Sequence, residues 1–272
     1  MARDFSKNAS NYMSLGINTI VPVLAGSSQI SIHAFVTVDS FPASTTFCND
    51  ILSFAFGQGS AAGILLFDTS SGNNRLRFGG RSVNTDTFQT STGGTNLSTG
   101  VQYSVGCVVD YPNDRVRLYV DGVQDANTAV TFANTTLTQT SGTNTTPDGI
   151  GAGFSGAVPV SLNRQMDGRI SEVSVFASDI GLAGFQMLSD GYAADMIGPV
   201  PSFYLPLLGD DSPERDHYGG ASGTITGTIA QADHPRILYP VAPRLILPVT
   251  VTPAFRAPWA TRSRTIIGGG IR

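Results

Sequence analysis

The chain has 272 residues, of which 41% are hydrophobic and only 13% are charged, and it contains 31 glycines. Charged residues that favour helices are scarce, because one Lys and two Glu stand against fifteen Arg and eighteen Asp. This composition argues against helical bundles, coiled coils and most α/β enzymes. It predicts an all-β fold with many short strands and turns.

The net charge of −4 is divided unevenly along the chain. Residues 1–235 carry all 20 acidic residues and 10 of the 16 basic ones, which gives −10, whereas residues 236–272 carry six basic residues and no acid, which gives +6. We therefore predict a β-sandwich domain at 1–234 and an extended Pro- and Arg-rich C-terminal arm at 235–272. The acidic domain argues against specific nucleic-acid binding.

Alternation of apolar and polar side chains predicts the strands of the domain. In chain order they lie near 11–16, 30–38, 51–56, 63–68, 75–79, 101–110, 115–120, 149–154, 169–176 and 202–208. The alternation is clearest in 30–38, and Val105, Cys107 and Val109 are expected to point inward. Asp121-Gly122 ends one strand with a dipeptide typical of hairpin turns. Strands at this spacing indicate a sandwich.

Two stretches between the strands, 81–100 and 126–149, are rich in Ser, Thr, Asn and Gly. Such side chains compete for backbone hydrogen bonds, so both stretches are predicted to be exposed loops. The outward side chains of 115–120 are expected to be Arg115, Arg117 and Tyr119. The one good helix candidate is 181–190, whose apolar residues share a face and whose glycines keep it short.

The C-terminal arm is marked by prolines that recur mostly every five residues from about residue 235. Proline fixes φ and lacks a ladder donor, so the arm is predicted to run extended. Its apolar side chains need another surface to cover them, either the protein's own sandwich or a neighbouring subunit. The residues expected to bind this partner are Arg244, Phe255, Arg256, Trp259, Arg262 and Arg264.

Several segments carry a family resemblance. They are Asn11–Gly16, Ile30–Phe35, Arg115–Gly122, Asp167–Phe176, Phe203–Leu208, Asp216–Gly220 and Gly223–Gly227. The most specific are Leu-Tyr-Val-Asp-Gly at 118–122 and Asp-Gly-Arg-Ile-Ser-Glu-Val at 167–173. Together, residues 10–230 resemble a concanavalin A-like lectin/glucanase jelly roll of the laminin-G type, of the kind found in tailed-phage virion proteins. The resemblance implies a jelly-roll β-sandwich, on which lectins, glucanases, adhesive modules and virion proteins are all built.

A glucanase of this superfamily would carry two carboxylates close together on one strand, in a Glu-x-Asp-x-Glu motif. The corresponding strand here has Glu172 alone, because Ser174 and Phe176 occupy the next positions on the same face. Glu214 is the other Glu of the chain. No Gly-x-Ser-x-Gly nucleophile elbow is present either. We therefore predict no enzyme, no catalytic residue and no cofactor.

Calcium is the one weak cofactor candidate, and each group that could bind it has a plainer interpretation. His217 lies near four acidic residues, which form either a cation site or a solvated loop: Asp210, Asp211, Glu214 and Asp216. Residues that could form a calcium-assisted sugar site are equally typical of turns: Tyr111, Asp121, Asp125, Asn127 and Asp148. No metal ligand is assigned.

The remaining motifs concern redox state and location. Cys48 and Cys107 are expected to be buried free thiols, and His33 a solvated or hydrogen-bonded residue on the polar face of its strand. The chain has neither an N-terminal apolar signal segment nor a run of ~18 apolar residues, so no signal-peptide secretion and no membrane partner are expected.

The favoured function is a non-catalytic structural virion protein of a tailed phage, a capsid decoration or minor head protein that docks through its arm. Its expected partners are other virion subunits and copies of itself, as a trimer or dimer. It would be assembled in the host cytoplasm and reside in the virion. The alternative is a carbohydrate-binding module of a receptor-binding tail protein or adhesin. Its glycan would bind the loops at 81–100, 111–114 and 126–149.

Overall fold

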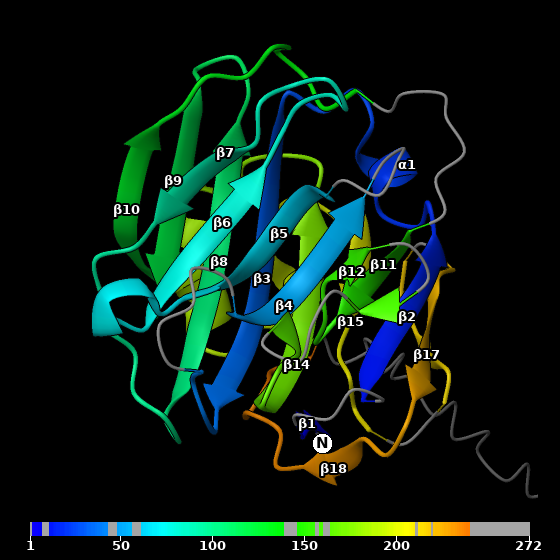
Figure 1. Ribbon diagram of the computed structural model, residues 1–272. Coiled ribbons are helices and arrows are strands. Elements are labelled where there is room, and N and C mark those ends of the chain that lie inside the picture. Colours follow the sequence, from blue (N-terminus) through cyan, green and yellow to red (C-terminus); the bar gives the residue numbers. More distant parts are fainter. Residues whose placement is uncertain are drawn as a thin grey trace, which may run out of the picture. The chain divides into compact units, whose positions relative to one another are not determined.

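Two antiparallel β-sheets form the folded part of the chain (Figure 1). The computed structural model describes residues 2–6, 11–42, 48–55, 61–138, 146–155, 158–159, 164–209, 212–218 and 220–239. Sheet A has the strand order β10 (Val123–Ala129), β9 (Arg115–Val120), β8 (Gln102–Asp110), β3 (Gln29–Val38), β14 (Gly168–Phe176), β1 (Ala2–Phe5) and β18 (Ala230–Ala232). In addition, β15 (Phe203–Leu205) pairs with β14.

Sheet B has the strand order β16 (Glu214–Arg215), β17 (Ser222–Thr226), β2 (Tyr12–Ile17), β11 (Pro147–Ile150), β4 (Cys48–Ala55), β5 (Ala61–Asp68), β6 (Arg75–Gly80) and β7 (Gln89–Thr92). The other described elements are the ribbon of β12 (Phe154–Ser155) and β13 (Val158–Pro159), the helices α1 (Val21–Leu24) and α2 (Gly181–Ser189), and the short turns η1 (Ser70–Gly72) and η3 (Ala194–Met196). No described helix is long and apolar enough to span a membrane.

The core lies between the inner faces of the two sheets, as the alternation predicts. Val105, Cys107 and Val109 of β8 are fully buried there, in one cluster with Leu65 and Phe67 of sheet B. Cys48 and Cys107 are buried free thiols, so that prediction is confirmed. The all-β sandwich predicted from the sequence is therefore the fold observed.

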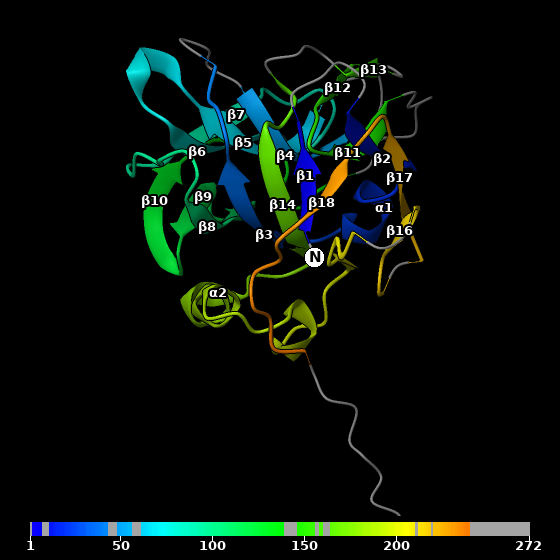
Figure 2. The same ribbon diagram turned by 90° about the horizontal axis from the view of Figure 1, so that it is seen from below.

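Helix α2 covers part of the outer face of sheet A (Figure 2). The Phe185 ring stacks on the Tyr119 ring with centroids 4.0 Å apart. Gly106 makes room for this contact, since a Cβ there would lie 2.4 Å from the Phe185 ring. Tyr119 thus points away from the core as predicted, but the prediction that it faces solvent is wrong, because α2 buries it to 2% exposure.

The loop predictions for 81–100 and 126–149 are wrong in part. Residues 89–92 form β7, β10 continues to Ala129, and β11 begins at Pro147. β7 and β10 each occupy the end of a sheet, where one side of the strand has no ladder partner. An edge strand is held by backbone hydrogen bonds, which form whatever side chains the strand carries. A polar edge strand therefore need not show the apolar alternation on which the strand prediction depends.

A strap, residues 230–239, follows the sandwich strands. It begins as β18, paired with β1, and ends beside the C-terminus of α2, where the Leu238 N–H donates to the Gly191 carbonyl at 2.7 Å. The described residues all fall in one unit, Met1–Pro240. The predicted boundary at 234/235 stays a prediction. The arm residues Arg244, Phe255, Arg256, Trp259, Arg262 and Arg264 lie outside the described residues.

Candidate functional site

The residues considered for a calcium-assisted sugar site are not brought together by the fold. Tyr111 cannot serve as an exposed platform for a sugar, because it is 2% exposed and packs edge-on against Phe132 at 4.8 Å. Asp148 is fully buried in sheet B, where its carboxylate accepts the N–H groups of Thr19 and Ile20 at 2.9 and 2.7 Å. Both side chains therefore support the fold.

The three others belong to sheet A. Asp121 lies in the turn between β9 and β10 with φ of +49°, and its carboxylate accepts the Ser104 N–H at 2.9 Å. Asp125 lies at a bulge of β10 and accepts the N–H and hydroxyl of Thr95 at 2.9 and 2.5 Å. Asn127 is exposed on β10. Both carboxylates thus accept backbone N–H groups, Asp121 from β8 and Asp125 from the loop that follows β7.

The acidic segment near His217 forms no metal cluster in the described part of the chain. Across the described residues, no group of three or more His, Cys, Asp or Glu side chains is arranged to hold a metal ion. Asp216 instead accepts the N–H groups of Tyr204 and Tyr218, at 2.8 and 3.0 Å. Asp210 and Asp211 lie outside the described residues.

The two glutamates are both buried, and each has its own partners. Glu172 is 3% exposed and accepts hydrogen bonds from Tyr204 at 2.5 Å and Tyr239 at 2.6 Å. Glu214 is 6% exposed and forms an ion pair with Arg3 at 2.7 Å. This arrangement does not supply the adjacent, accessible carboxylates that glycosidic bond cleavage requires.

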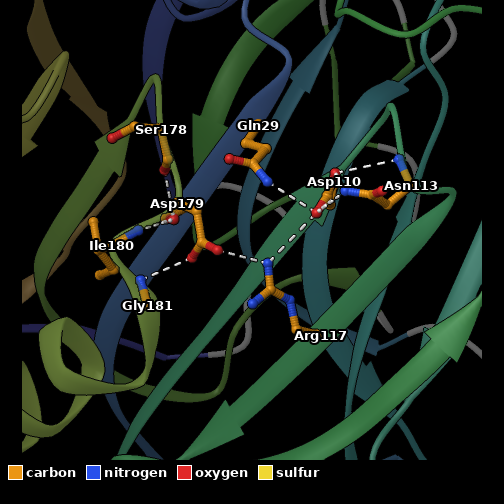
Figure 3. A network of polar contacts seen from close by, with 9 residues as sticks. Gln29, Asp110, Asn113, Arg117, Ser178, Asp179, Ile180 and Gly181 are labelled. Atoms are coloured by element: carbon orange, nitrogen blue, oxygen red, sulfur yellow. Dashed lines mark hydrogen bonds and ion pairs between the residues drawn. The ribbon is translucent and has the colours of Figure 1, made fainter.

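A polar network joins the turn at 111–114 to the start of α2 (Figure 3). Asp110 accepts hydrogen bonds from Gln29 at 2.9 Å and from Asn113 at 3.0 Å. Arg117 donates to Asp179 at 2.7 Å, and Asp179 also accepts the Gly181 N–H at 2.8 Å. Because these groups satisfy one another, the network positions α2 on sheet A rather than presenting free groups to a ligand.

A row of polar side chains crosses the outer face of sheet A elsewhere. The strand register places Asp4 of β1 beside Arg169 of β14, Arg169 beside Thr37 of β3, and Thr37 beside Gln102 of β8. Alternation along each strand turns these positions away from the core. Helix α2 packs further along the same strands, over Gly106. The row is exposed at Gln102, partly exposed at Asp4 and Arg169, and buried at Thr37.

This row opens into a shallow surface hollow. Its main part has a volume of about 410 Å³ and is lined by Asp4, Arg169, Gln231, Ala232 and Asp233. A small recess that shares Arg169 and Asp233 adjoins it. The recess is lined further by Ala2, Phe35, Val36, Thr37, Gln102, Ser171 and Pro235. The volume lies within the range usual for small-ligand sites.

Charge in the hollow centres on Arg169. Its Nε is buried and has no hydrogen-bond partner among the described residues. Burial raises the pKa of the neighbouring Asp4 carboxyl, and the nearby Asp39 raises it further, while Arg169 acts in the opposite direction. A guanidinium offers several donors in one plane, and the carboxylates beside it offer acceptors. The hollow can therefore both donate hydrogen bonds to a polar ligand and accept them from it.

Sequence reasoning missed this site because its residues are far apart in the chain and of common types. The alternation in 169–176 was a usable signal, since it puts Arg169 and Ser171 on the polar face of a predicted strand. The contributions of β1 and β18 carried no such signal. Both strands are short, and they were not predicted.

Comparisons with known proteins agree with this fold. Curated protein sequences give no match to the chain. A candidate carbohydrate-binding protein from Bacteroides ovatus is similar in structure, with a TM-score of 0.60 and 22% identity over 87% of this chain and 61% of that chain. The present chain thus spans less than two thirds of that protein's length.

Two further solved structures show the same fold. A heptameric SAP-like pentraxin from Limulus polyphemus has a TM-score of 0.52 and 14% identity over 69% of this chain and 81% of that chain. The CBM40 module of a Ruminococcus gnavus IT-sialidase has a TM-score of 0.50 and 13% identity over 70% and 97%. The sequence profile of one family matches residues 7–180. The chain belongs to this family, the concanavalin A-like lectin/glucanases superfamily.

Proposed function

We propose that the chain is a non-catalytic carbohydrate-binding module whose ligand binds in the hollow around Arg169. The observation that carries the proposal is the hollow itself. It is an open site of about 410 Å³ in which a guanidinium lies among Asp4, Asp233 and Gln231. At the sequence-predicted loops, by contrast, Asp121 and Asp148 accept backbone N–H groups, and Asp125 accepts the N–H and the hydroxyl of Thr95.

The chemistry of the hollow suits a saccharide. Each sugar hydroxyl donates one hydrogen bond and accepts others, and the wall of the hollow supplies both kinds of partner. Arg169 can donate, and Asp4 and Asp233 can accept, whereas the Gln231 side chain already donates to the Gly209 carbonyl. Ala232 and Pro235 offer small apolar surfaces for the C–H groups of a sugar ring.

The structural neighbours support a carbohydrate ligand more than a role in a capsid. The Bacteroides ovatus neighbour is a candidate carbohydrate-binding protein, and the Ruminococcus gnavus neighbour is a CBM40 module of a sialidase. Their low identities make this support for the fold, and the hollow supplies the argument for the site. The capsid decoration role predicted from the sequence finds no support in the comparisons.

A glycan array followed by calorimetry tests the proposal. We expect the full chain to bind one or more glycans, and Arg169→Met to weaken that binding about tenfold or more, because hydrogen bonds to charged groups contribute roughly 1.5–3 kcal/mol. The matched control is Arg115→Met, an exposed arginine on β9. It should leave the affinity within about twofold of the wild type.

The same assay separates the hollow from the loop site. Asp125→Ala removes the acceptor for Thr95 and should lower stability while leaving glycan affinity unchanged. Binding that survives Arg169→Met but is lost in Asp125→Ala, or on calcium chelation, would place the ligand at the loops. The proposal would also be wrong if a folded wild-type chain bound no glycan on the array.

A further inference from the structure

The strap at 230–239 forms one wall of the proposed ligand site. Gln231, Ala232, Asp233 and Pro235 line the hollow, and all belong to the strap. The same segment passes beneath sheet A toward the end of α2 (Figure 2). Whatever holds the strap in place therefore also holds this wall of the hollow.

The strap is anchored on the buried carboxylate of Glu172, which accepts three hydrogen bonds. Oε2 accepts the Tyr204 hydroxyl at 2.5 Å. Oε1 accepts the Tyr239 hydroxyl at 2.6 Å and the His234 Nε2 at 3.0 Å. His234 and Tyr239 are strap residues, so two of the three donors tie the strap to β14.

Both ring nitrogens of His234 face oxygen acceptors. Nδ1 lies 2.8 Å from the Pro235 carbonyl, and Nε2 lies 3.0 Å from Glu172 and 3.3 Å from the Pro206 carbonyl. A neutral imidazole carries one N–H, so one nitrogen would then direct a lone pair at an oxygen. This geometry fits the imidazolium. Burial lowers the pKa of His234, but the hydrogen bond and charge of Glu172 outweigh it and raise the pKa overall.

The other ionisable groups around Glu172 keep their charge state near neutral pH or do not touch the carboxylate. His33 of β3 stays neutral, because burial lowers its pKa to about 3. Burial and the Glu172 charge raise the pKa of Tyr204 and Tyr239, so both stay protonated. Asp195 of η3 acts on these tyrosines through its charge. His217 packs edge-on against the Tyr204 ring at 5.2 Å.

We propose that His234 and Glu172 form a pH-dependent latch, in which protonated His234 holds the strap against the sandwich and its deprotonation loosens one wall of the ligand site. The effect on the ligand rests on the proposed function, whereas the effect on the strap does not. The latch is closed below the unfolded-state pKa of histidine, about 6.5, and opens as pH rises through the higher pKa of the folded state.

Amide hydrogen exchange of the full chain tests the latch without a ligand. The readout is the protection factor of the Leu238 N–H, which is bonded to Gly191, at about pH 5.5 and about pH 8.5. We expect wild-type protection to fall on the order of tenfold at the higher pH. His234→Gln should abolish this dependence, and His217→Gln, the matched control, should keep it. Tyr239→Phe removes a strap donor without changing charge and should lower protection equally at both pH values.

Equal wild-type protection at the two pH values, or an unchanged pH dependence in His234→Gln, would overturn the latch. The glycan array, run at both pH values, separates the two proposals. If the wild type binds glycan more weakly at the higher pH and His234→Gln removes this pH dependence, both the latch and the site are supported. A strap that loosens with pH in a chain that binds no glycan supports the latch and contradicts the proposed function.

Discussion

Glu172 shows how one residue can lose one interpretation and gain another. In the sequence it is a single carboxylate where a glucanase would carry two, and this argues against glucanase catalysis. In the structure its backbone has φ of +56° at an irregularity in β14, and its side chain accepts hydrogen bonds from β15 and the strap. A positive φ in a residue with a long side chain is strained, and the hydrogen bonds offset that cost.

The fold shifts the pKa values of two histidines near Glu172 in opposite directions. His33 is fully buried, and its Nε2 lies 2.9 Å from the Ser104 hydroxyl, while its Nδ1 has no partner among the described residues. Burial disfavours its charged form. Glu172, whose Oε1 lies 3.0 Å from the His234 Nε2, raises the pKa of His234. The first histidine should therefore make the fold sensitive to acid, and the second should make the strap sensitive to base.

His33→Gln should make the fold less sensitive to acid. The folded-state pKa of His33, about 3, lies below its unfolded-state pKa near 6.5. The stability that neutral His33 contributes is therefore fully present above pH 6.5 and is lost as pH falls toward 3. Between pH 7 and pH 5 this loss amounts to about 2 kcal/mol. Urea unfolding of both proteins at the two pH values measures it. Equal losses in wild type and variant would show that His33 is not the responsible group.

At the scale of elements, alternation found the central strands of sheet A and missed several short or polar strands. β3, β8, β9 and β14 each turn one face toward the apolar core, so their core residues recur mostly at every second position. β7 and β10 are short or polar and pair with the preceding strands β6 and β9, whereas β1 and β18 are defined by backbone pairing with partners far along the chain. β1, for example, pairs with residues 168–170 and 230–232. No local pattern announces such a pairing.

The candidate site was hidden for the same reason. Its polar row exists only because Asp4, Arg169, Thr37 and Gln102 come into register across four strands. Residue types made Asp121 and Asp125 candidates for a sugar site, whereas in the structure both carboxylates accept backbone N–H groups. Single residues could thus be proposed from the sequence, but their convergence could not.

The packing of α2 on sheet A depends on the absence of a side chain at Gly106. Gly106→Ala would place a Cβ 2.4 Å from the Phe185 ring and 2.5 Å from the Ile32 carbonyl. We expect a loss of about 1–3 kcal/mol in the free energy of unfolding, since overpacking forces neighbours to move. Gly198→Ala, which meets no atom within 4 Å, is the matched control and should be nearly neutral. Equal stability of the two variants in urea would contradict this packing.

At the scale of the whole chain, net charge is divided: residues 1–235 are acidic overall, and residues 236–272 carry basic residues and no acidic one. The structure shows that 235–239 already contact the sandwich, through the strap bonds of Leu238 and Tyr239. A deletion meant to test the arm should therefore spare these residues, because removing them would also remove a Glu172 partner. Truncation after Pro240 meets this condition and keeps the whole unit Met1–Pro240.

The arm is still predicted to join copies of the chain as a dimer or trimer. Light scattering should then show an oligomer for the full chain and a monomer for the chain ending at Pro240, with the same melting temperature for the sandwich. Trp259→Ala should weaken association by about 2 kcal/mol, roughly thirtyfold, because large aromatic side chains dominate interface energetics. Thr261→Ala, two residues further on, should have little effect. A full chain that is monomeric, or a truncated chain that keeps the same oligomer, would exclude the arm as the assembling element.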